Sequence, residues 1–70
     1  QYDEAINAYN KSLEIKPDFF WSWFRLGRCY LLTQNEEKAL KYFRKAKELD
    51  LEIFEKLVNS KEEFHSMKEL

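Results

Sequence analysis

Three landmark positions occur twice in this chain, separated by 34 residues. They are Ala5, Tyr9 and Pro17 in the first copy and Ala39, Phe43 and Leu51 in the second. A fixed period of this length is typical of proteins in which pairs of helices stack one after another. The single glycine and the single proline leave few points at which a helix would be interrupted. The sequence therefore predicts an all-α chain.

Helical spacing of apolar residues divides the chain before the last twenty residues into three helices. The first is expected to run from residue 2 to about Ile15, because Pro17 disfavours the helical conformation in the residue before it. Asp18 is the expected N-terminal cap of a second helix that runs to about Leu32. Asn35 is the expected cap of a third helix, which should end near residue 49.

The region from Trp23 onward carries a more specific pattern, W-x2-L-G-x2-Y followed by A-x3-F. The residues that form it are Trp23, Leu26, Gly27, Tyr30, Ala39 and Phe43. Through these residues the chain resembles the tetratricopeptide repeat (TPR) family over residues 1 to about 51. Antiparallel helix–turn–helix repeats are implied, so that the chain is an α-solenoid fragment. We expect Gly27 to face Ala39, because two helices approach closely only where side chains are small.

The repeat period also predicts how a single domain of residues 1–70 is divided. Residues 1–17 are expected to be the second helix of a truncated repeat, 18–50 one complete repeat, and 51–70 a C-terminal capping helix. Lys61 stands where the period places Gly27, which argues against another helix packing closely on this last one. The alternative is a break near Asn59, because Ser60 and Glu63 have the spacing of a capping box.

Composition and motifs argue against several functional classes. Lys and Arg number 12 and Asp and Glu 13, so no net charge favours nucleic acid or an anionic membrane. No phosphate-binding loop, Ser/His/Asp set or Cys/His spacing occurs, so we expect neither an enzyme nor a cofactor. Glu62 and His65 lack a second pair of metal ligands, and Cys29 is expected to be a buried apolar residue. One cysteine and no signal peptide indicate the cytoplasm.

The family resemblance implies a concave groove lined by the first helix of each repeat. The predicted partner-binding residues on the second helix are Trp21, Phe24, Arg25, Arg28 and Leu31. Aromatic residues and arginine are enriched at interface hot spots, so these residues predict a protein or peptide partner that carries apolar and acidic groups. Chaperone tails are not favoured, because Phe24 and Arg28 replace the lysine and asparagine of relatives that bind them. The alternative is that Trp21 and Phe24 pack against another helix, for example through Phe54 and Val58.

Function is therefore expected to be that of a protein-interaction scaffold. The first helix lacks a covering partner, so either upstream repeats belong to the parent protein or the chain forms a homo-oligomer through this helix. A purely structural end of a longer array, or a self-assembly element without a ligand, is the alternative function. The basic residues of the third helix are expected to form a solvated outer face, with a docking patch as the alternative. They are Lys41, Arg44, Lys45 and Lys47.

Overall fold

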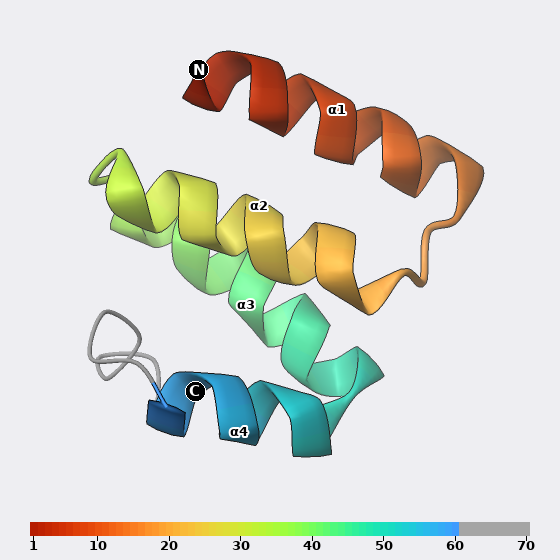
Figure 1. The fold of residues 1–70 in the computed structure, drawn as a ribbon, viewed down its shortest axis with the longest axis vertical. Coiled ribbons are helices and arrows are strands. Elements are labelled where there is room, and N and C mark those ends of the chain that lie inside the picture. Colours follow the sequence, from red (N-terminus) through yellow and green to blue (C-terminus); the bar gives the residue numbers. More distant parts are fainter. Residues whose placement is uncertain (61–70) are drawn as a thin grey trace.

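The computed structural model describes residues 1–60, which form four α-helices (Figure 1). They are α1 (Tyr2–Ile15), α2 (Phe20–Leu32), α3 (Glu36–Leu49) and α4 (Leu51–Ser60). Successive helices reverse direction, and no strand occurs among these sixty residues. The predicted all-α fold is confirmed, as are the expected helix ends at Ile15, Leu32 and Leu49.

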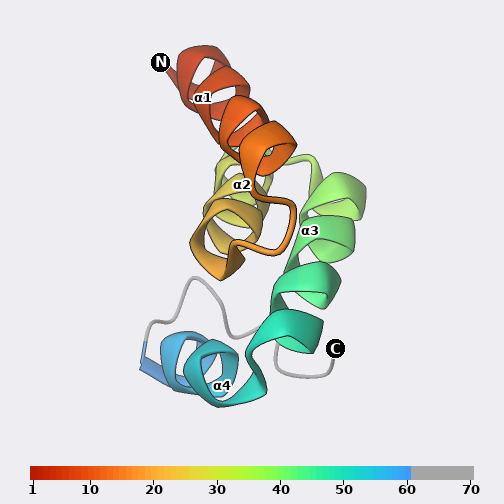
Figure 2. The same ribbon diagram turned by 90° about the vertical axis from the view of Figure 1, so that its right-hand side faces the viewer.

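The helices α2 and α3 form the central pair of the molecule. They share the most extensive contact, while α1 packs on α2 and α4 packs on α3 (Figures 1 and 2). The helix α4 continues through Asn59 and Ser60, and the rest of the predicted capping helix, with Lys61, lies outside the described residues. The division of the chain into repeats and cap therefore stays a prediction.

Two of the helices have a side-chain cap at their N-terminus. Asn35 Oδ1 accepts the backbone N–H of Lys38 at 3.3 Å, which confirms the predicted cap of α3. Asp50 Oδ1 accepts the backbone N–H of Ile53 at 3.1 Å and so caps α4, a role that the sequence analysis missed. Each such bond satisfies one of the backbone donors that a helix leaves unpaired at its start. These two caps allow α3 and α4 to begin immediately after short connections.

The start of α2 differs from the prediction. The helix begins at Phe20 after the N-cap residue Phe19, and no side chain caps it, so the predicted role of Asp18 is wrong. Residues 17 and 18 instead form a turn in which the Phe19 N–H donates to the Lys16 carbonyl at 3.2 Å. Asp18 therefore lies one position too early, since a capping side chain must come from the N-cap residue itself.

Three phenylalanine rings from three different helices form the centre of the core. Phe24 of α2 lies 5.1 Å from Phe43 of α3 and 5.9 Å from Phe54 of α4, measured between ring centroids. The Phe43 and Phe54 rings are 6.2 Å apart, and all three pairs meet edge to face. Such pairs contribute about 0.5–1.5 kcal/mol each beyond the burial of their surface. This cluster therefore holds α2, α3 and α4 together.

The contact that requires Gly27 is with one of these rings. A Cβ atom added at Gly27 would lie 2.8 Å from Cδ1, 2.9 Å from Cε1 and 3.0 Å from Cγ of Phe43. Carbon atoms that are not bonded prefer a separation of about 3.5–4.0 Å, so a side chain here would displace the ring. The three atoms nearest to this position all belong to Phe43, and the expected pairing of Gly27 with Ala39 stays a prediction. Ala39 is fully buried but lies one helical turn earlier on α3.

The first helix is attached differently from the other three. None of its residues is fully buried, and Ile15 remains 86% exposed. Ser22 Oγ of α2, which is almost completely buried, donates a hydrogen bond to Ser12 Oγ of α1 at 2.9 Å. Trp23 Nε1 donates to the Pro17 carbonyl at 2.7 Å and ties the connection between the two helices to α2. Polar bonds therefore supplement a weaker apolar contact between α1 and α2.

Candidate functional site

The exposed side of α2 presents four side chains in a line. They are Trp21, Arg25, Arg28 and Leu32, which we call the α2 strip. Steps of four, three and four residues place them within an arc of about 60° on the helix. Arg25 and Arg28 are exposed, Leu32 is 39% exposed, and Trp21 is half-buried. The α2 strip is thus bordered by an apolar side chain at each end and carries two cations between them.

The structure separates the predicted partner-binding residues into two groups. Trp21, Arg25 and Arg28 lie in the α2 strip, whereas Phe24 is 4% exposed and belongs to the core. Its contact with the ring of Phe54 is the one that the packing alternative anticipated. Leu31 and Trp21 are both half-buried, and both pack against the same core cluster. Phe24 is therefore inaccessible to a partner, and Leu31 lies at the edge.

Leu32 is the strip residue that the sequence analysis missed. It follows Arg28 by four residues, so the helical spacing that selected the predicted row includes it equally well. Leu31 and Leu32 are both apolar, and only the rotation of α2 against α3 decides which of them faces the core. The helical spacing of Leu32 could be recognised in the sequence, but it did not show which of Leu31 and Leu32 is the exposed one.

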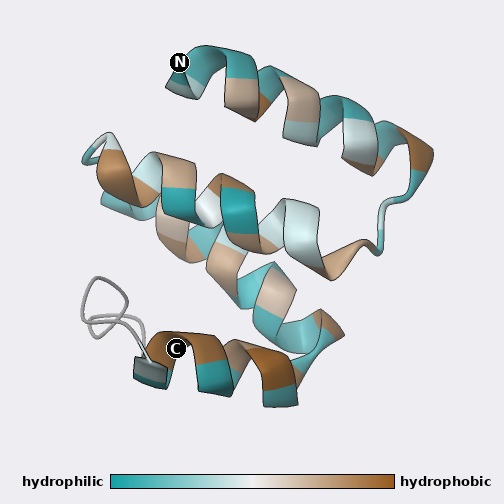
Figure 3. Cartoon of the chain, viewed as in Figure 1, coloured by the Kyte–Doolittle hydropathy of each residue, from teal (hydrophilic) through white to brown (hydrophobic). Residues whose placement is uncertain are grey.

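The electrostatics of α2 differ from those of the whole chain. The complete sequence has a net charge of −1, but α2 contains two arginines and no carboxylate. The Arg25 guanidinium lies over the Trp21 ring, with Cζ 5.4 Å from the ring centroid, a distance at which the cation and the ring attract each other. In Figure 3, teal hydrophilic segments of α2 lie among white, neutral and brown, hydrophobic ones. The helix α2 therefore contributes two positive charges and no negative charge to the strip.

Cys29 lies directly beside Arg28 but offers no nucleophile. Its side chain is 8% exposed, and burial raises the pKa of the Cys29 thiol, while the neighbouring Arg28 lowers that pKa by less. A raised pKa keeps the sulfur protonated, whereas nucleophilic cysteines act as thiolates. The predicted buried position of Cys29 is confirmed.

A second group of aromatic rings lies at the contact between α2 and α3. Tyr42 lies between Trp23 and Tyr30, with ring centroids 5.6 Å and 5.3 Å away. Burial raises the pKa of Tyr42, and the adjacent Tyr30 raises it further. The indole N–H of Trp23 is already bonded to the Pro17 carbonyl. The stack therefore joins α2 to α3 and ties the α1–α2 connection to them.

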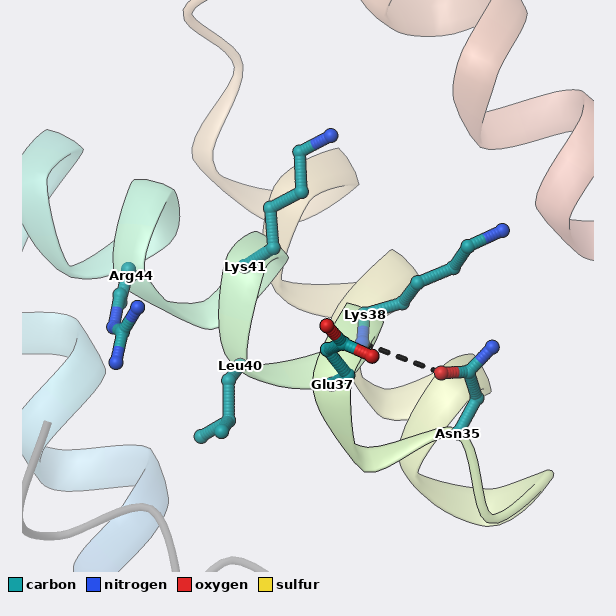
Figure 4. A pocket seen from close by; sticks show the side chains of 6 residues that line it. All are labelled: Asn35, Glu37, Lys38, Leu40, Lys41 and Arg44. Atoms are coloured by element: carbon teal, nitrogen blue, oxygen red, sulfur yellow. Dashed lines mark hydrogen bonds between the residues drawn. The ribbon is translucent and has the colours of Figure 1, made fainter.

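The outer side of α3 bears the basic residues and a shallow hollow of about 660 Å³ (Figure 4). The residues that line it are Asn35, Glu37, Lys38, Leu40, Lys41 and Arg44. Lys41 and Arg44 are exposed, while Lys45 and Lys47 are half-buried. Lys45 forms a 3.8 Å ion pair with Glu48 three residues later. The carboxylates of α3 lie at its two ends, at Glu36, Glu37 and Glu48, and the five cations lie between them. The solvated face and the docking patch both stay predictions.

Residues 1–60 show neither a metal site nor a membrane-spanning helix. No group of three or more His, Cys, Asp or Glu residues there is placed to hold a metal ion. No helix in that range combines the length and the apolar character needed to span a membrane. Glu62 and His65, which the sequence analysis considered as metal ligands, lie outside the described part of the chain.

Comparison with known proteins agrees with this arrangement of helices. Two family models match the chain, one described as "TPR repeat" over residues 1–34 and one as "Tetratricopeptide repeat" over residues 20–53. The "Chitin biosynthesis protein CHS6" of Saccharomyces cerevisiae is 41% identical over 39 residues, which is 56% of this chain but 5% of that protein. No solved structure is significantly similar. The two family matches cover residues 1–53, and the chain belongs to the tetratricopeptide repeat family.

Proposed function

We propose that this chain is a protein-interaction module that binds a partner with acidic and apolar groups through α2. Tetratricopeptide repeats in general mediate contacts between proteins, and the chain has the helices of that family. The observation that carries the proposal is the α2 strip, in which two exposed arginines and no carboxylate lie between the half-buried Trp21 and the exposed Leu32. Leu31 contributes at the edge of this surface. The proposal includes no catalytic step, and it places the protein in the cytoplasm, where the single thiol stays reduced.

The chemistry of the α2 strip explains the kind of partner. Arg25 and Arg28 present planar guanidinium groups that donate charge-assisted hydrogen bonds to carboxylates. A hydrogen bond to a charged group contributes about 1.5–3 kcal/mol, so two of them would supply a substantial part of a micromolar affinity. Trp21 and Leu32 provide apolar surface that becomes buried when a partner covers the strip. Trp21 is already held in place by Phe20 and by Arg25, so little side-chain freedom is lost on binding.

The proposal is tested by affinity capture with the tagged chain and three variants. Trp21→Ala and Arg28→Glu should lose the bound proteins that the unaltered chain retains, because each removes one contact type from the strip. Lys41→Glu is the matched control, since it makes the same change of charge on the outer side of α3. A partner retained equally by all four proteins would show that α2 is not the binding surface.

Self-association through α1 is the second candidate function, and a specific feature favours it. Ile15 is 86% exposed and borders a hollow of about 450 Å³ between α1 and the start of α2. The residues that line this hollow are Ala8, Lys11, Ser12, Ile15, Lys16 and Phe19. Exposed apolar surface of this kind is typical of a protein contact. A concentration series in sedimentation velocity should show dimers or larger species that Ile15→Asp abolishes, and a monomer at all concentrations would exclude this function.

A further inference from the structure

We infer that the partner segment bound by α2 is an acidic amphipathic helix and not an extended peptide. The inference rests on the proposed function and specifies the conformation and the residue spacing of the partner. It follows from the positions of the four side chains of the α2 strip along the helix axis.

The spacing of the strip distinguishes the two conformations. Successive steps of four, three and four residues correspond to about 6, 4.5 and 6 Å along the axis, or about 16 Å from Trp21 to Leu32. In an extended peptide the side chains on one face recur every ~6.8 Å, so four of them cover about 20 Å. The fourth side chain of an extended peptide would then lie roughly 4 Å away from the position of its contact on α2, which is longer than a hydrogen bond. A second helix with steps of four, three and four residues matches all four positions.

The order of the contacts specifies the partner's residues. Opposite Trp21 and Leu32 the partner helix needs apolar side chains, and opposite Arg25 and Arg28 it needs carboxylates. The pattern is therefore apolar, acidic, acidic, apolar, with three, two and three residues between them. Because these steps read the same in both directions, a parallel and an antiparallel partner fit equally well. Residues of this kind form one stripe on a helix and leave the opposite side to solvent.

Charge complementarity favours this occupant over a second copy of the chain. Carboxylates are absent from α2, so each acidic residue of a partner meets a cation without a competing anion on the same helix. The helices α1 and α3 each carry carboxylates and lysines intermixed on their exposed sides, and the exposed pair Glu52 and Lys56 of α4 is joined at 3.3 Å. The exposed Glu52 and Glu55 of α4 do have the required step of three residues, but the positions four residues before and after them are Glu48 and Asn59, which are not apolar. The complete apolar, acidic, acidic, apolar stripe is therefore absent from the helices of residues 1–60.

Binding of three designed peptides to the full chain tests the inference. The first is a sixteen-residue helix, stapled on its outer side, with leucine at the first and twelfth positions and glutamate at the fifth and eighth. The second has the same composition without the staple, with these four residues at every second position. The third is the stapled helix with glutamine in place of both glutamates. Fluorescence anisotropy of labelled peptides gives each affinity.

The stapled acidic helix should bind at least about tenfold more tightly than either of the other peptides, since the loss of one charge-assisted hydrogen bond corresponds to roughly that factor and the glutamine peptide loses two. Arg25→Glu and Arg28→Glu should each weaken its binding by a similar factor, and Lys41→Glu should not change it. Equal or tighter binding of the alternating peptide would overturn the helical partner but leave the proposed function standing. Binding of the stapled helix that neither arginine variant weakens would overturn the site itself. No measurable binding of the stapled helix would also overturn the inference, while the affinity-capture experiment decides separately on the proposed function.

Discussion

Replacement of Gly27 by alanine probes the closest contact between α2 and α3. The added methyl group would lie 2.8–3.0 Å from three atoms of the Phe43 ring, including Cγ next to the backbone. The ring cannot easily move away, because it is fully buried and is held between Phe24 and Phe54. Either the ring leaves its preferred rotamer or α2 and α3 separate. Both changes disturb the phenylalanine cluster at the centre of the fold.

Two opposing effects determine the size of the change in stability. Alanine favours a helix over glycine by about 1 kcal/mol in mid-helix positions. Inserting a methyl group into a well-packed core typically costs about 1–3 kcal/mol, and the short distances at Gly27 place this case near the upper end. The net expectation for Gly27→Ala is a loss of about 1–2 kcal/mol in the free energy of unfolding. For a domain of this size that lowers Tm by on the order of 5–15 °C.

Urea unfolding followed by far-ultraviolet circular dichroism measures this loss, and Phe43→Leu supplies the control background. Without the ring, Gly27→Ala should be neutral or should raise stability by up to about 1 kcal/mol, as its helix propensity alone predicts. The two backgrounds should therefore differ by about 1–3 kcal/mol in the effect of the same substitution. If Gly27→Ala raised the stability of both proteins equally, the steric contact with Phe43 would not be the reason for a glycine at this position.

Other predictions concern the turn, the caps and the thiol. Gln34 has a φ of +63° in the α2–α3 turn, so Gln34→Gly should raise the free energy of unfolding by about 0.5–1 kcal/mol; an unchanged urea midpoint would contradict this. Asn35→Ala should lower it by about 1 kcal/mol, whereas Asp18→Ala should have little effect, and equal losses would show that Asp18 acts as a cap after all. Because the pKa of Cys29 is raised, its alkylation by iodoacetamide should reach half-maximal rate at a higher pH in the folded chain than in urea; coinciding rate profiles would refute the burial effect.

Much of the secondary structure follows from local features of the sequence. Pro17 ends α1, Asn35 begins α3, and the spacing of apolar residues predicts the helices between them. These signals act within one or two turns of the chain, so they can be recognised without knowledge of the rest of the fold. The start of α2 was misassigned because Asp18 and Phe19 are adjacent, and a shift of one residue decides which of them is the N-cap.

The site was predicted only in part for a related reason. Helical spacing placed Trp21 and Arg28 in one row with Phe24 and Leu31, and the family resemblance added Arg25. Of these residues, the structure places Trp21, Arg25 and Arg28 in the α2 strip. The same spacing allowed Phe24 to be either exposed or buried, and the rings of Phe43 and Phe54 decide that it is buried. Periodicity shows which residues share a face but not how that face is rotated relative to the neighbouring helices.

By itself, the sequence determined the repeat length, the number and direction of the described helices, and the absence of a carboxylate in α2. Only the tertiary structure showed that the ring of Phe43 packs against Gly27. Only the tertiary structure showed that Leu32 is exposed in the α2 strip while Phe24 is buried in the core. Local rules act along one helix, whereas these choices depend on side chains that meet across helices and share the same space.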